Sequence, residues 1–191
     1  NTHLNKGPSK LLEAINSSID VDQRMYKEDI EGSIAHAKML GRQKIISKKD
    51  EVKIVNGLKV ILSNIQKGKV KFKKELEDIH MNVESMLFQQ IGATAGKLHT
   101  ARSRNDQVVT DFKLWIRNNS ADLDKMLQKL QKVLINIAKK HTDTILPGYT
   151  HLQVAQPISL AHYSLAYVEM MGRDRQRLKN CIGILNENPL G

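Results

Sequence analysis

The stretch VTDFKLWIRNNSADLDKMLQKLQKVLINI, residues 109–137, indicates the fold because its apolar residues recur at helical spacing. One stripe of this stretch, interrupted only by Ser120, carries seven large apolar residues: Phe112, Ile116, Leu123, Leu127, Leu130, Leu134 and Ile137. A period close to 3.5 residues, sustained over this length, is typical of a long helix in a helical bundle. We therefore expect one uninterrupted helix, on the order of 45 Å long.

The sequence before this stretch also predicts helices. Apolar residues at helical spacing predict helices over 21–40, 47–67 and 79–90, which end near Gly41, Gly68 and Gly92. The second of them begins with Ser47 and Asp50, which resemble a capping box in which Asp replaces the usual Glu.

The sequence after the long stretch predicts a break and then another helix. Residues 141–157 contain Pro147, Gly148 and Pro157, so we expect a loop or a broken turn there. Residues 158–182 predict a second long helix with its apolar face inward, formed by Leu160, Tyr163, Tyr167 and Met170. No segment shows the alternation typical of strands, and the predicted fold class is all-α.

Composition narrows the possible classes of protein. The chain has 191 residues and a single cysteine, which excludes an internal disulfide framework and a multi-cysteine metal site. No apolar run approaches the ~20 residues that a membrane-spanning helix needs. We expect a soluble cytoplasmic protein that binds no membrane.

The net charge of +10 raises nucleic acid as a possible partner. Only eight of the 30 basic residues are Arg, however, and aromatic residues make up 4% of the chain. Nucleic-acid modules more often combine clustered Arg with aromatic side chains for stacking. The charge therefore favours a solvated, Lys-coated surface over a nucleic-acid interface, and attraction of a small anionic substrate also fits it.

The segment GKLHTARSRNDQ, residues 96–107, is unusually polar for the start of a long helix. Asn105 or Ser103 could cap that helix, and Asp106 would offset the positive end of its dipole. Capping does not explain Arg102 and Arg104, because cations are unfavourable at a helix N-terminus. A planar guanidinium matches two carboxylate oxygens, so these residues indicate a site for an anion.

The segment GYTHLQVAQP, residues 148–157, contains a candidate for proton transfer. His151 follows Thr150 and precedes Gln153, and histidine is the side chain most easily tuned to titrate near neutral pH. A lone histidine in a loop is more often structural, and the same holds for His80. No histidine pair has metal-ligand spacing, so we expect no metal site.

These segments together resemble a known family. GKLHTARSRNDQVVTDFKLWIRN at 96–118 and PGYTHLQVAQP at 147–157 are similar to two characteristic regions of the argininosuccinate lyase and delta-crystallin family, within the fumarase/aspartase superfamily. DVDQRMYKEDIEGSIAHAKML at 20–40, EDIHMNVE at 77–84 and IGATAGKLHT at 91–100 also resemble it, in the same order.

The resemblance implies a fold and an activity. It implies a small helical N-terminal domain over 1–103 and the first long helices of a central bundle over 104–191, in a homotetramer whose active sites are shared between subunits. The implied reaction is the cofactor-free β-elimination of argininosuccinate to fumarate and arginine, the last step of arginine biosynthesis and part of the urea cycle.

The resemblance also implies roles for single residues. Substrate binding would fall to Ser18, Ser103, Arg104, Asn105 and Thr150. His151 matches the active-site histidine, whereas His80 and Gln153 would have supporting roles.

The sequence departs from the family pattern in two ways, and two alternative functions fit it. The family usually opens with a WGGRF-like stretch, which this sequence lacks, and its catalytic serine loop belongs beyond residue 191. We therefore expect these 191 residues alone to be inactive. A delta-crystallin-like structural protein, or a lyase acting on a different succinyl amine, would share the same features.

Overall fold

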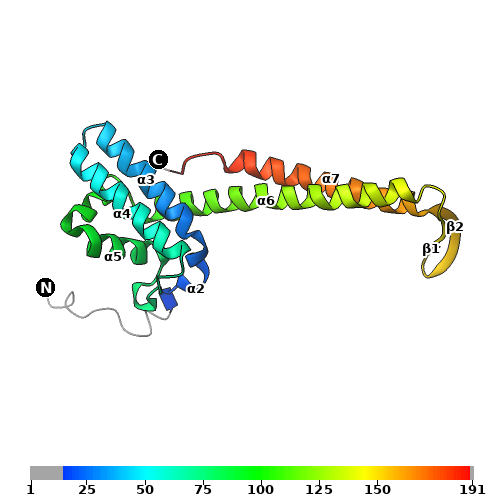
Figure 1. The fold of residues 1–191 in the computed structure, drawn as a ribbon, viewed down its shortest axis with the longest axis horizontal. Helices are drawn as coiled ribbons and strands as arrows, with labels where there is room; N and C mark the ends of the chain where they lie inside the picture. The colour runs from blue at the N-terminus through cyan, green and yellow to red at the C-terminus, as the bar shows by residue number, and fades with distance from the viewer. Residues whose placement is uncertain (1–14, 190–191) are drawn as a thin grey trace. The chain divides into compact units, whose positions relative to one another are not determined.

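The structure is a computed structural model that describes residues 15–189 (Figure 1). Its α-helices are α2 (Ile19–Asp22), α3 (Tyr26–Arg42), α4 (Lys48–Gln66), α5 (Ile79–Ile91), α6 (Arg104–Lys140) and α7 (Leu160–Leu185). Short 3₁₀ helices η1 (Gln23–Met25), η2 (Lys74–Leu76) and η3 (Gly92–His99) connect them, and strands β1 (Ile145–Thr150) and β2 (Gln153–Ser159) form one hairpin. The predicted all-α class is confirmed.

The described residues form two compact units. One ends at Trp115 and also includes Asn188, and the other runs from Ile116 to Glu187. The division between the units therefore falls inside α6. The predicted sequence domains, 1–103 and 104–191, stay a prediction.

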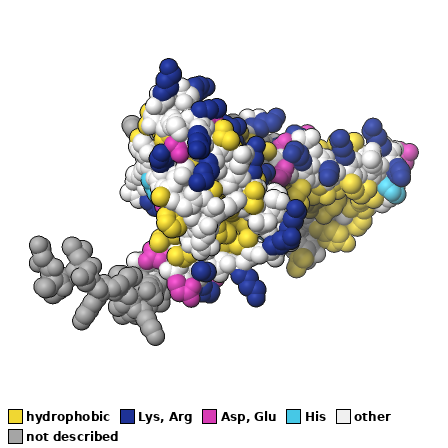
Figure 2. All heavy atoms as spheres, turned by 60° about the vertical axis from the view of Figure 1, so that its left-hand side comes forward, with side chains coloured by type: hydrophobic (Ala, Val, Ile, Leu, Met, Phe, Trp, Pro, Cys, Tyr) yellow, Lys and Arg dark blue, Asp and Glu magenta, His cyan; other side chains and the backbone are white. Residues whose placement is uncertain are grey.

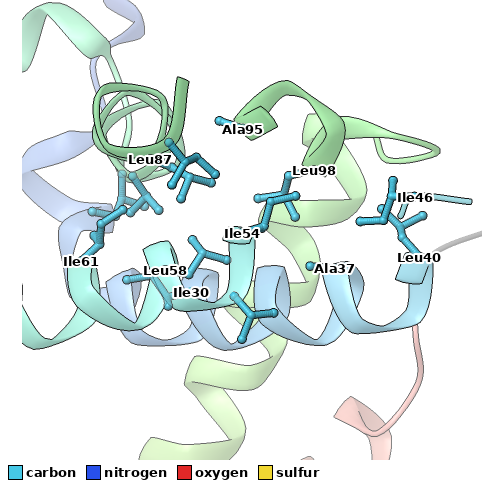
Figure 3. Packing of buried hydrophobic residues seen from close by; sticks show 14 of the residues in the cluster. Ile30, Ala37, Leu40, Ile46, Ile54, Leu58, Ile61, Leu87, Ala95 and Leu98 are labelled. Carbon is cyan, nitrogen blue, oxygen red and sulfur yellow. The ribbon is translucent and has the colours of Figure 1, made fainter. Parts of the chain in front are cut away.

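Helices α3, α4 and α5 pack around the hydrophobic core of the first unit. Its largest fully buried apolar side chains come from all three helices: Ile30 and Leu40 from α3, Ile54 and Leu58 from α4, and Ile79 and Leu87 from α5. Figure 3 shows Ile54 and Leu58 of α4 among side chains of the neighbouring helices. Gly57 permits a close approach, because a Cβ atom there would lie 2.8 Å from Cδ1 of Leu87.

The boundaries of α4 and α5 follow local signals in the sequence, whereas α3 continues past Gly41, where the sequence predicted its end. Ser47 accepts a hydrogen bond from the backbone N–H of Asp50 at 3.1 Å and caps α4, as predicted. Asp78 caps α5 by accepting from the N–H of Met81 at 2.6 Å. Gly68 and Gly92 follow α4 and α5 with φ of +66°, a conformation that glycine adopts without a steric penalty.

The second unit contains the rest of α6, the hairpin and α7. Arg175 of α7 donates to Asp124 of α6 at 2.6 Å, and Gln131 of α6 donates to the carbonyl of Val168 at 2.8 Å. The prediction that the large side chains of α7 point inward is wrong for Tyr163, Tyr167 and Met170, which are exposed.

The apolar stripe of α6 is also largely open in this chain. Leu123, Leu130 and Ile137 are exposed, and so are Phe112 and Met126. Among residues 15–189 the second unit has two long helices and a hairpin, too few elements to cover every face of α6 and α7. Figure 2 shows hydrophobic side chains over a broad area of the long helices, whereas Lys and Arg side chains are spread over the face drawn there.

The hairpin corrects the expectation of a loop over 141–157. Tyr149 pairs with Val154 and Thr150 with Gln153, and an irregularity between Pro147 and Tyr149 interrupts the register. His151 and Leu152 form the connection with φ of +48° and +64°. Two central residues with positive φ are what a two-residue hairpin turn of type I′ requires. Sequence reasoning missed the strands because prolines and glycine normally punctuate loops.

No helix within the described range is both long and apolar enough to span a bilayer.

Shortening a core side chain of α4 should destabilise the protein far more than shortening an exposed one. We expect Leu58→Ala to lower the free energy of unfolding by about 2–5 kcal/mol, because it removes buried surface and leaves a cavity. The matched control is Val60→Ala on the exposed side of the same helix, with an expected loss within about 0.5 kcal/mol. Urea denaturation measures both, and equal losses would contradict the core assignment.

Candidate functional site

The polar segment before the long helix forms the N-terminal cap of α6. Ser103 accepts a hydrogen bond from the backbone N–H of Asn105 at 3.3 Å, and Asp106 lies in the first turn. Ala101 has φ of +55° just before the helix. The capping part of the prediction is therefore confirmed for Ser103.

Arg104 has carboxylate and amide partners from the protein itself. Its Nη2 donates to Oε2 of Glu84 at 2.9 Å, and its Nη1 donates to Oε1 of Gln107 at 2.9 Å. The side chain is 31% exposed, so the guanidinium also reaches solvent. A guanidinium has five N–H groups, and donors are left for another acceptor. Glu84 is thus a partner for this cation within the protein, and the anion site predicted for Arg104 stays a prediction.

Glu84 lies between a histidine and an arginine. Its Oε1 lies 2.7 Å from Nε2 of His99, and its Oε2 receives the hydrogen bond from Arg104. Partial burial favours the neutral acid, but the bonds from His99 and Arg104 outweigh it and lower the pKa of Glu84. Glu84 is therefore an anion at neutral pH.

A buried charged cluster lies behind this surface group. Asp29 of α3, His80 of α5 and Asp111 of α6 have side chains that are only 1–2% exposed. Nδ1 of His80 lies 2.9 Å from Oδ1 of Asp29 and 3.3 Å from Oδ2 of Asp111. Gln107 donates through Nε2 to Oδ1 of Asp29 at 2.5 Å. Because Gln107 also accepts from Arg104, hydrogen bonds run from the surface to the buried cluster.

The pKa values of His80, Asp29 and Asp111 depend on one another. Burial alone would lower the pKa of His80, but the hydrogen bonds and charges of Asp111 and Asp29 raise it to about 9. Burial raises the pKa of Asp111 to about 7 against the opposing effect of His80, and the charge of Asp29 adds to the rise. Burial also favours protonation of Asp29, but its bonds to His80 and Gln107 keep its pKa low. We infer an imidazolium held between two carboxyl groups.

Arg102 is the second arginine of the segment and lies deeper than Arg104. Its Nη1 donates to Oγ of Ser33 at 3.0 Å. Burial lowers its pKa, and the nearby charges of Asp29 and Asp111 oppose that effect. Within the described residues, two buried nitrogen atoms of this region have no hydrogen-bond partner: Nε2 of His80 and Nε of Arg102. A small cavity lined by Ser33, His80 and Arg102 lies beside them.

Asp29, His80 and Asp111 also meet a geometric condition for a metal site. One possible ligand atom from each lies within 4.8 Å of the others. In the arrangement seen, Nδ1 of His80 bonds to Asp29 and Oδ1 of Asp29 also accepts from Gln107. These contacts use the same atoms that a cation would need, so the cluster fits an internal ion pair better than a metal centre. The predicted absence of a metal stays a prediction.

The predicted site residues divide between the two compact units. Ser18, His80, Ser103, Arg104 and Asn105 belong to the first unit. Ser18 precedes α2, donates to Oδ2 of Asp22 at 2.6 Å and donates its backbone N–H to the carbonyl of Glu77 at 2.9 Å. Burial raises the pKa of Asp22, despite the opposing bond from Ser18.

The remaining predicted residues lie in the hairpin of the second unit. Thr150 ends β1, Gln153 begins β2 and His151 is the first residue of the turn between them. All three are exposed. The positive φ of His151 is a requirement of the two-residue turn. The structure therefore brings Ser103, Arg104 and Asn105 together and places Thr150, His151 and Gln153 in a second group.

Sequence reasoning missed Asp29, Glu84, Gln107 and Asp111. A helical signal could have found two of them, since Glu84 follows His80 by one turn on α5 and Gln107 follows Arg104 by three residues on α6. Asp29 and Asp111 gave no local signal, because acidic residues on helices usually face solvent.

The buried cluster predicts that stability falls as the pH rises from about 6.5 to about 9. In the unfolded chain a histidine loses its proton near pH 6.5, whereas folded His80 retains it until about pH 9. The folded state binds more protons in this window, so the free energy of unfolding decreases with pH. Asp111, with a pKa raised to about 7, acts in the same direction at lower pH.

Urea denaturation at several pH values measures this dependence. We expect His80→Gln to lower stability at pH 6.5 and to flatten the decline toward pH 9, whereas His141→Gln, which alters a surface contact with Thr144, should retain it. An unchanged pH dependence in His80→Gln would contradict the ion-pair assignment.

Known proteins match this chain in sequence over almost its whole length. The sequence model of a family described as Lyase matches residues 4–191. Argininosuccinate lyase of Bartonella bacilliformis is 52% identical over 185 residues, covering 97% of this chain and 40% of that protein. Argininosuccinate lyase of Heliobacterium mobile is 52% identical over 186 residues, covering 97% of this chain and 41% of that protein. The chain thus spans about 40% of the length of these curated relatives.

Solved structures show the same fold. A variant of EDDS lyase with bound fumarate has a TM-score of 0.77 at 27% identity, covering 90% of this chain and 33% of that one. A fumarate lyase:delta crystallin from Brucella melitensis has a TM-score of 0.76 at 16% identity, covering 95% of this chain and 46% of that one, and this likeness concerns the fold alone. The predicted resemblance is confirmed, and the chain belongs to the lyase family.

Proposed function

We propose that the protein is an argininosuccinate lyase that cleaves argininosuccinate to fumarate and arginine by β-elimination, in the last step of arginine biosynthesis. The observation that carries the proposal is 52% identity to argininosuccinate lyases over 185 residues, a span that includes both polar segments. The geometry adds a partly exposed guanidinium at the N-terminus of α6, where backbone N–H groups also favour an anion.

The reaction needs a base, fixed donors and an acid. A base removes the proton beside a carboxylate, and the charge that develops spreads into that carboxylate. Donors that are in place before the reaction stabilise this charge, and an acid protonates the departing guanidino nitrogen. The reaction requires no cofactor.

We assign the substrate contacts to Ser18, Ser103, Arg104, Asn105 and Thr150. Ser103, Arg104 and Asn105 are adjacent at the start of α6, which supports a shared role in binding a carboxylate group of the substrate. Thr150 lies in the hairpin of the second unit, apart from these residues in the sequence.

His151 is assigned to proton transfer, and His80 to a supporting role. His151 is exposed at a hairpin turn and so is accessible to a substrate. His80 is buried, and its contacts with Asp29 and Asp111 fit a residue that holds the site together without touching substrate. Gln153, beside the turn, is assigned a supporting role as well.

We further propose a cytoplasmic homotetramer that shares active sites between subunits. The exposed apolar residues of α6 and α7 support association, because apolar areas of this extent usually mark protein interfaces.

A second candidate is a lyase that acts on a different amine derived from fumarate. The likeness to the EDDS lyase variant with bound fumarate favours this class of reaction. A panel of succinyl amines, assayed beside argininosuccinate, separates the two candidates. A delta-crystallin-like structural protein would turn over none of them.

The direct test is fumarate release from argininosuccinate by the intact protein. We expect turnover by the wild type, and a decrease on the order of 100-fold in Arg104→Lys and in His151→Asn, because fixed donors and proton transfer each contribute that much. Arg42→Lys and His141→Asn are the controls, with near-normal rates. Absence of turnover in the wild type would overturn the proposed activity, and a near-normal rate in either test variant would remove that residue from the site.

A further inference from the structure

We propose that Glu84 is a positioning residue that fixes the guanidinium of Arg104 for binding an anionic substrate. This inference rests on the proposed function and adds to it a residue that acts through Arg104. The carboxylate of Glu84 lies beside the group proposed to bind a substrate carboxylate. Two like charges repel each other, so the position of Glu84 needs a structural reason. Its contacts identify that reason.

Arg104 is held along two edges of its guanidinium. Glu84 accepts from Nη2 and Gln107 accepts from Nη1, both at 2.9 Å. An arginine side chain that is free in solution loses considerable rotamer entropy when it is ordered on a ligand. Two hydrogen bonds made before the ligand arrives remove much of that cost. The guanidinium is therefore preorganised, with further N–H groups available to a carboxylate.

Glu84 is itself fixed by its surroundings. It lies on α5 between the buried residues Val83 and Leu87, so its backbone is part of the core of the first unit. Its second carboxylate oxygen lies 2.7 Å from Nε2 of His99. The carboxylate is thus held between a helix and a second polar side chain, and its position does not depend on Arg104 alone.

The charges around Glu84 explain why an anion can still bind beside it. Arg104 and the N-terminus of α6 are both positive, and Glu84 offsets the repulsion between them. The other carboxylate oxygen of Glu84 contacts Nε2 of His99. An incoming carboxylate therefore meets a guanidinium at the positive end of a helix, beside an acid whose two oxygens are already engaged.

The other edge of Arg104 is connected to the buried cluster. Gln107 accepts from Arg104 and donates to Asp29, which is paired with His80. The position of Arg104 thus depends on α5 through Glu84 and on α3 through Gln107 and Asp29. Glu84 is the better residue to test, because its side chain is 38% exposed and the substitution leaves the buried ion pair intact.

The test compares Glu84→Gln and Glu84→Ala with Glu31→Gln, an acid on the surface of α3, in the intact protein. Gln keeps an oxygen that can accept from Arg104, whereas Ala removes it. We expect the KM for argininosuccinate to rise about tenfold in Glu84→Ala and less in Glu84→Gln, with kcat changed little, because the loss affects binding of the carboxylate. Wild-type KM values in both Glu84 variants would overturn the proposal.

A double substitution separates positioning from a general structural effect. If Glu84 acts through Arg104, adding Glu84→Ala to Arg104→Lys should raise KM no further than Arg104→Lys alone. If the increases in KM caused by the two substitutions multiplied in the double variant, the proposal would be overturned and the proposed function would stay intact.

A crystal structure of the Glu84→Ala variant gives a readout that does not require activity. We expect the Arg104 guanidinium to leave its observed position while α5 and α6 stay unchanged. An unmoved guanidinium would overturn the positioning role. If wild-type protein showed no turnover of argininosuccinate, the proposed function would fail, and this structure would still decide the role of Glu84.

Discussion

The structure of the first compact unit depends on the burial of His80 between Asp29 and Asp111. Each residue comes from a different helix, α5, α3 and α6, and all three side chains are almost completely removed from solvent. Taking charged groups out of water costs several kcal/mol per ion unless they are paired, so this cluster is stable only when the three helices meet in one arrangement. The hydrophobic core of α3, α4 and α5 drives the packing, and we infer that the ion pair specifies how α6 joins it.

This constraint extends to the surface where the candidate site lies. Gln107 connects Asp29 with Arg104, and Glu84 connects Arg104 with α5. A cation at the N-terminus of a long helix would otherwise be repelled by the helix dipole. The contacts that offset this repulsion also fix the orientation of the Arg104 side chain. A group held by rigid elements and hydrogen-bonded neighbours is what binding of a charged substrate requires.

The sequence predicted the features that depend on local signals. The apolar period predicted α6, glycines predicted where α4 and α5 end, and Ser47 predicted the cap of α4. The helix dipole indicated that Arg104 has an anionic partner, but the sequence did not indicate that Glu84 is one such partner. The hairpin was missed because Pro147, Gly148 and Pro157 gave a stronger signal for a loop than the β-branched residues gave for strands. Asp29 and Asp111 were missed because both pair with His80, which is 51 residues from Asp29 in the sequence. Apolar periodicity does not report contacts between such distant residues. The prediction that Tyr163, Tyr167 and Met170 point inward was wrong for a similar reason. An apolar face on a helix does not show which other segment packs against it.

The most direct test of this account is the protonation state of His80 in the intact protein. Nitrogen NMR of the His80 ring at pH 7.5 distinguishes an imidazolium, with both nitrogens protonated, from a neutral ring. We expect an imidazolium, because the flanking carboxyl groups raise the pKa of His80 to about 9. A neutral ring at this pH would contradict it, since the ion pair on which the arrangement of α3, α5 and α6 depends would then be absent.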